Sequence, residues 1–147
     1  MPRNWFRVVH LLCLILPARR AAAAVAPNSA GGFRLWTTAA RITPGLTGSY
    51  INRSLRNYAA QVDWRGVHTI AGVRVDEAIA FAAPRYWGSR AAVGLTGGTD
   101  ADWADFSVQW DGYVEVLEDG LQLATISDDG SRFWIDRSMI RACLAWP

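Results

Sequence analysis

The sequence has 147 residues, of which 51% are hydrophobic and 19% are charged, a composition that allows one globular domain with a modest core. Its formal net charge is +2, and no stretch of the chain forms the basic stripe that nucleic-acid binding requires. Nucleic acid is therefore not an expected partner.

Residues 1–26 have the pattern of a secretory signal peptide, which we expect to be helical. Arg3 and Arg7 precede an apolar run over 8–16, and the small residues of 22–26 offer cleavage sites. The apolar run is shorter than the ~20 residues that a membrane-spanning helix needs. We expect export to the periplasm, the cell surface or the medium, with no membrane span after removal of the signal. An uncleaved anchor is the alternative.

Removal of this segment would change the charge and the thiol content. Four of the 15 basic residues lie within it, so 11 basic residues would face 13 acidic ones. The positive net charge thus belongs to the signal. Cys13 would also be lost and Cys143 would remain, so the mature chain could form no internal disulfide.

After the signal, the chain indicates short strands and glycine-rich turns. Residues 27–42 are expected to be a linker or leader, and 46–52 a first strand that follows a Thr-Pro-Gly turn. Residues 68–81 contain short strand pieces interrupted by glycine, and 84–98 are typical of a loop.

The second half contains the clearest strand patterns. Residues 106–116 alternate apolar and polar positions, and Gly112 suggests a bulge. Residues 121–136 are predicted to be a hairpin, because two alternating runs flank Ser-Asp-Asp-Gly. No segment after residue 26 has a convincing helical period, which favours an all-β fold.

Four segments resemble blocks of the PA-fourteen domain family, the β-sandwich named from anthrax protective antigen. They are GLTGSY at 45–50, RVDEAIAF at 74–81 followed by Trp-Gly at 87–88, FSVQWDGY at 106–113, and SDDGSRFWID at 127–136. The match covers 43–136. It implies an antiparallel β-sandwich that often binds carbohydrate or glycoconjugates.

In the lectin-like members of that family, two successive aspartates hold a Ca²⁺ ion that binds sugar hydroxyls. Asp128 and Asp129 match those positions, so the resemblance implies that both are metal and carbohydrate ligands, with Ca²⁺ as the cofactor. Ca²⁺ takes six to eight hard oxygen ligands, which suits this chemistry. The alternative is a structural turn whose carboxylates cap backbone N–H groups.

The resemblance ends after Asp136, where the family continues with a turn glycine and further strands. Residues 137–147 contain no such glycine, so they are expected to be a divergent tail, and the sandwich over 43–136 is expected to be incomplete at its C-terminal end. A non-functional gene fragment is one alternative reading.

Other residues carry weaker signals. Trp87 and Trp103 lie in expected loops and are candidates for stacking on sugar, as are Trp64 and Tyr86, with core packing as the alternative. An acidic loop could add cation ligands, or simply be solvated; its aspartates are Asp100, Asp102 and Asp105.

No catalytic residues are predicted. Adjacent carboxylates in one turn cannot flank a glycosidic bond, and His68 stands in no recognisable triad motif. We therefore expect a secreted, non-catalytic carbohydrate-binding module. The alternative is an interaction or spacer module, with a protein of the cell surface as its partner.

Overall fold

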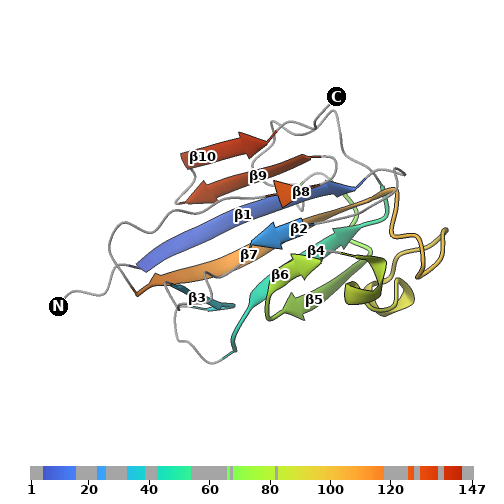
Figure 1. Cartoon of the computed structure of the whole chain (residues 1–147), viewed down its shortest axis with the longest axis horizontal. Helices are drawn as coiled ribbons and strands as arrows, with labels where there is room; N and C mark the ends of the chain where they lie inside the picture. The colour runs from blue at the N-terminus through green and yellow to red at the C-terminus, as the bar shows by residue number, and fades with distance from the viewer. Residues whose placement is uncertain are drawn as a thin grey trace.

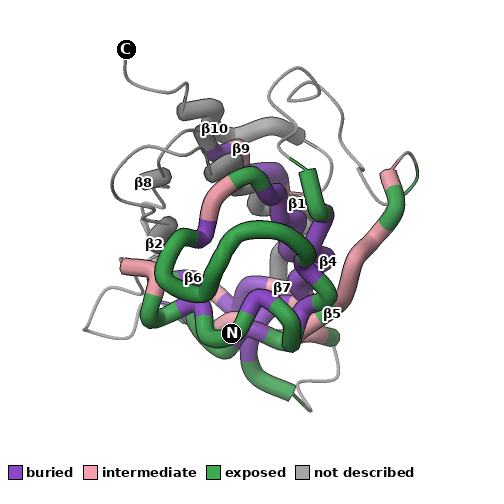
Figure 2. Tube along the Cα trace, turned by 90° about the vertical axis from the view of Figure 1, so that its right-hand side faces the viewer, coloured by how far each residue is buried: buried purple, intermediate pink, exposed green. Residues whose placement is uncertain are grey.

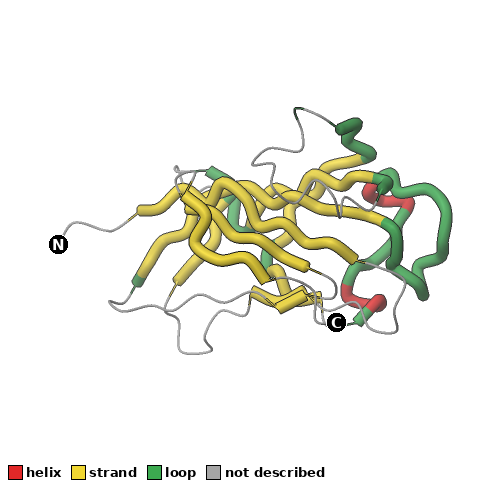
Figure 3. The backbone as a smooth tube through the Cα atoms, turned by 90° about the horizontal axis from the view of Figure 1, so that it is seen from above, coloured by secondary structure: helices red, strands yellow, loops and turns green. Residues whose placement is uncertain are grey.

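The structure is a computed structural model of the whole chain. It describes residues 5–15, 23–25, 33–38, 43–53, 66, 68–81, 83–117, 126–127, 130–135 and 138–143. Within these residues the fold is all-β, as the sequence predicts, with two single-turn 3-10 helices in the loops (Figures 1 and 3).

Ten strands are described, and they follow the chain in the order β1 Trp5–Ile15, β2 Ala23–Val25, β3 Phe33–Trp36, β4 Leu46–Ile51, β5 Gly72–Asp76, β6 Ile79–Phe81, β7 Phe106–Val116, β8 Ile126–Ser127, β9 Gly130–Ile135 and β10 Ser138–Cys143. The 3-10 helices η2 Pro84–Tyr86 and η3 Ala91–Val93 lie between β6 and β7. The bounds predicted for β7 are confirmed, and those for β4 differ by one residue.

Seven strands form one open antiparallel sheet in the order β10-β9-β1-β7-β4-β5, and β3 also pairs with β7 (Figure 1). β7 pairs with three strands of this sheet: β1 lies along one side of it, and β4 and β3 share the other. β5 and β10 are the outer strands.

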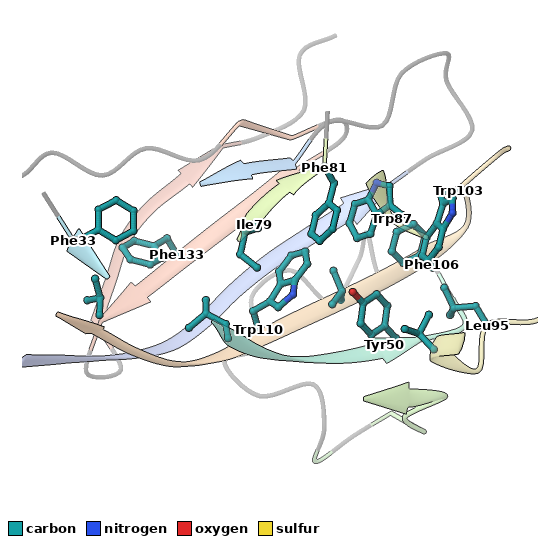
Figure 4. Packing of buried hydrophobic residues seen from close by; sticks show 14 residues of the cluster. Phe33, Tyr50, Ile79, Phe81, Trp87, Leu95, Trp103, Phe106, Trp110 and Phe133 are labelled. Carbon is teal, nitrogen blue, oxygen red and sulfur yellow. The ribbon is translucent and has the colours of Figure 1, made fainter. Parts of the chain in front are cut away.

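A second sheet of three short strands, in the order β6-β2-β8, lies over one face of the large sheet (Figures 1 and 2). The two sheets enclose aromatic side chains. Phe81 of β6 stacks on Trp110 of β7, with ring centroids 5.9 Å apart, and on Trp87 at 3.9 Å. This cluster is the centre of the core (Figure 4).

Gly112 of β7 is required by close packing. A Cβ atom at this position would lie 2.5 Å from a methyl carbon of Leu46 and 2.5 Å from the carbonyl oxygen of Trp36. The predicted bulge lies nearby but on the partner strand, because the β1–β7 register shifts between Val8 and Leu11, opposite this part of β7.

The N-terminal segment differs from the expected signal helix. Trp5–Ile15 is strand β1 and pairs with both β7 and β9. A short apolar run fits a buried strand as well as a helix, and the Val, Ile and aromatic residues of this segment favour the strand once both neighbours are present. Export and cleavage of this segment remain predictions.

The predicted hairpin over 121–136 is not formed by the described residues of that segment. β8 pairs with β2 in the small sheet, whereas β9 pairs with β1 and β10 in the large one. Because both sides of β9 are occupied, β8 has no edge to join. The two strands therefore belong to different sheets.

The tail expected to diverge from the domain continues the large sheet. β10 pairs antiparallel with β9, with Ser138 opposite Ile135, so only two residues connect the strands. The missing turn glycine does not prevent this pairing.

Candidate functional site

The Asp128–Asp129 pair lies outside the described residues, but its flanking residues are described. Ser127 ends β8 and pairs with Ala23 in the small sheet, and Gly130 begins β9 and pairs with Leu14 in the large sheet. The pair therefore occupies the connection between the two sheets. Its role as a metal site stays a prediction.

A row of paired residues relates this connection to the rest of the large sheet. Gly130 is opposite Leu14, Leu14 opposite Ser107, and Ser107 opposite Ile51. Three strand spacings of ~4.8 Å separate β9 from β4, or about 14 Å. The start of β9 and the end of β4 thus lie at the same end of the sheet, the end at the right of Figure 1.

A pocket of about 490 Å³ opens beside the end of β4, and it is lined by Ile51, Asn52, Arg53, His68, Thr69 and Ala71. Amide, guanidinium, imidazole and hydroxyl groups share this lining with two apolar side chains. Such a mixture provides both donors and acceptors of hydrogen bonds beside an apolar surface, as small-molecule sites do.

Two hydrogen-bonded contacts hold the rim of this pocket. The amide of Asn52 donates to the hydroxyl of Thr96, and the backbone N–H of Thr96 donates to the Asn52 amide oxygen over 3.2 Å. The Ser107 hydroxyl donates to the carbonyl of Arg53 over 2.8 Å. The first residues after β4 are therefore fastened both to the 84–98 loop and to β7.

Trp87 and Trp103 are in the core rather than on the surface. Their exposed fractions are 0% and 1%, and their rings stack with centroids 5.2 Å apart. Phe106 packs edge-on against both rings (Figure 4). A sugar cannot reach either indole face in this conformation, so the structure corresponds to the packing alternative for both residues.

Tyr86 is the loop aromatic that the described residues leave open to solvent, with 52% of its surface exposed. Arg85 lies over its ring, 4.6 Å from the centroid, and donates to its hydroxyl over 2.9 Å. Trp64 lies outside the described residues.

The acidic loop has a structural contact. The Asp100 carboxylate accepts a 2.7 Å hydrogen bond from the backbone N–H of Arg90, a buried residue whose guanidinium donates to the carbonyls of Gly97 and Ala104. Asp102 and Asp105 are exposed. Among the described residues, no group of three or more His, Cys, Asp or Glu side chains could hold a metal ion.

Behind β4, a buried polar network was not anticipated from the sequence. The Asp76 carboxylate accepts from the Tyr50 hydroxyl over 2.8 Å and from the Trp110 indole N–H over 2.6 Å, and it pairs with Arg74 over 2.5 Å. Arg74 also donates to the Tyr50 hydroxyl and to the carbonyl of Trp87. The sequence did contain a signal for this network. Arg74 and Asp76 are two residues apart on β5, so both charged side chains lie on the same face of the strand.

This network is a structural element rather than an open site. Asp76 is only 6% exposed and Tyr50 is fully buried. Burial raises the pKa of the Tyr50 phenol above its ordinary value, and the charge of Asp76 raises it further, while Arg74 acts in the opposite direction. Tyr50 therefore stays neutral and joins the edge strand β5 to the core.

Comparison with known proteins identifies no relative. No family model, no curated protein and no solved structure matches the chain. In the part of the chain that the structure describes, no helix is long and apolar enough to cross a bilayer.

Proposed function

We propose that this chain is a secreted, non-catalytic carbohydrate-binding module. The observation that carries the proposal is the polar pocket at the end of β4, lined by Asn52, Arg53, His68 and Thr69. Sugars present hydroxyl groups that both donate and accept hydrogen bonds, and this lining offers partners of both kinds.

The size of the pocket supports the same ligand class. Its volume of about 490 Å³ lies within the range of roughly 300–1,000 Å³ that is usual for small-molecule sites. Ala71, which is half-buried, adds a small apolar surface for the C–H face of a sugar ring, while Ile51 beside it is buried.

We also propose that binding depends on Ca²⁺ held by Asp128 and Asp129. Carboxylate oxygens are preferred ligands of this ion, and a vicinal diol of the sugar would complete its coordination. Gly130, the residue after Asp129, lies at the same end of the large sheet as Ile51 of the pocket, about 14 Å away across three strand spacings, so a glycan longer than one sugar would reach both.

For the fold, we propose a β-sandwich. The small sheet lies on one face of the large one, and aromatic residues fill the space between them, as Phe81 and Trp110 illustrate (Figures 2 and 4).

A second function, protein interaction, is favoured by the outer strand β5. Val73 and Val75 lie on the same face of β5, on either side of Arg74, and they are 60% and 42% exposed. An outer strand with apolar side chains suits the addition of a partner strand. A cell-surface protein would be the expected partner.

The proposal is tested by probing a glycan array with the labelled full chain, in the presence of either millimolar Ca²⁺ or EGTA. We expect binding to a set of glycans that EGTA abolishes and that Asp128→Asn and Asp129→Asn each weaken. Glu77→Gln, which removes an exposed carboxylate elsewhere, is the control. Binding that survives EGTA would reject the calcium mechanism, and a blank array would reject the sugar ligand.

A further inference from the structure

Strand β1 occupies a slot in the middle of the large sheet, between β7 and β9. Nine of its residues are paired with β7 and six with β9. From Leu11 to Leu14 the pairing is continuous on both sides. This slot is therefore defined by two backbone ladders rather than by one.

Strand β1, which fills the slot, lies within residues 1–26, and the proposed function expects this segment to be cleaved off during export. The inference rests on that cleavage. Cleavage after residue 26 would release β1, together with β2 of the small sheet. β7 and β9 would then each keep a row of backbone N–H and C=O groups without a neighbouring strand. Such rows are templates for the addition of another chain.

We propose that the slot between β7 and β9 is a strand-acceptor site, which in the exported protein binds an extended apolar strand of a partner protein antiparallel to β7. Pairing of main-chain groups on both sides would provide the affinity, as in other cases of strand addition.

The walls of the slot define the chemistry of the partner strand. Val108 and Trp110 of β7 and Phe133 and Trp134 of β9 are all nearly or fully buried. The segment 5–15 that fills the slot is apolar except for Arg7 and His10. A strand rich in Val, Leu, Ile and aromatic residues, about nine residues long, therefore fits.

A second copy of this chain is not the expected donor. Export would remove 1–26 from every copy, so no exported copy retains the segment that fits the slot. The proposed donor is therefore a segment of a different protein.

The test uses the full chain with a site-specific protease sequence inserted after Ala26, so that cutting can release both β1 and β2 as the proposed export cleavage would. After cutting, a fluorescent peptide with the sequence of 5–15, flanked by lysines for solubility and carrying Cys13→Ser, is added in excess. We expect its anisotropy to rise as it replaces the native fragment. Leu12, whose partners are Gln109 and Arg132, is the control position: a peptide with Leu12→Pro loses a ladder N–H and should bind at least tenfold more weakly.

Two results would overturn the proposal. One is equal binding of both peptides, which indicates nonspecific adsorption. The other is loss of the fragment on cutting while the remaining body stays monomeric with an unchanged melting temperature. Self-association of the cut body that the peptide prevents would support the proposal. Because no sugar is involved, failure of glycan binding does not affect this assay, and the N-terminal mass of the exported protein tests cleavage separately.

Discussion

Replacement of Asp76 by asparagine tests the buried network most sharply. The carboxylate accepts from Tyr50 and Trp110 and pairs with Arg74, whose side chain is 25% exposed. The amide can replace only one acceptor oxygen, and it leaves the guanidinium without its counter-charge. Breaking a buried ion pair costs about 3–5 kcal/mol. The partial exposure of Arg74 favours the lower end, so we expect the free energy of unfolding to fall by about 3 kcal/mol.

Urea unfolding of the full chain, followed by tryptophan fluorescence, measures this change. For a chain of this size the same loss lowers the melting temperature by about 6–12 °C. Glu77→Gln changes the adjacent but exposed carboxylate and should alter stability by less than about 0.5 kcal/mol. If Asp76→Asn were as mild as Glu77→Gln, the network would not stabilise the fold and the reasoning would be refuted.

Three further predictions concern packing and pH. Gly112→Ala should destabilise the fold by about 1–3 kcal/mol because its Cβ would meet Leu46, whereas a Cβ at Gly66 meets no atom of the described residues within 4 Å, so Gly66→Ala should change the urea midpoint little. Trp87→Ala should lower the free energy of unfolding by about 3–5 kcal/mol and reduce the near-UV circular dichroism signal. An unchanged stability and an unchanged signal would contradict the position of Trp87 in the core. The raised pKa of Tyr50 means that the unfolded chain loses this proton first, so stability should fall as pH rises above about 10, with a shallower fall in Tyr50→Phe. If the melting temperatures of the unmodified protein and of Tyr50→Phe fell equally between about pH 9 and pH 11, this effect of Tyr50 would be rejected.

Local alternation was sufficient to predict several strands. β7 has the predicted bounds, and β4 ends one residue earlier than predicted. Alternating apolar residues were enough to place β7, and the glycine turn at Gly45 marks the start of β4. The all-β class follows from the same patterns.

Pairing partners could not be read in the same way. An apolar run such as 5–15 satisfies a signal helix and a buried strand equally, and only the two neighbouring ladders favour the strand. Likewise, the alternation around Ser127 and Gly130 predicts strands but does not say that β8 and β9 belong to different sheets.

The candidate site was predictable only in part. Loop position suggested that Trp87 and Trp103 were accessible, but both fold back onto Phe106 and are buried. The pocket joins residues on either side of 54–65, and spacing along the chain does not reveal that Asn52 and His68 line the same space.

Calorimetric titration with the strongest glycan from the array tests the central claim most directly. His68→Ala and Thr69→Ala each remove a side chain that lines the pocket. Thr38→Ala is the matched control for Thr69→Ala, because Thr38 is an exposed threonine that follows β3, near the other end of β7. We predict that His68→Ala and Thr69→Ala each weaken binding about tenfold, while Thr38→Ala changes it less than twofold. Equal affinities for all four proteins would show that sugar does not bind in this pocket.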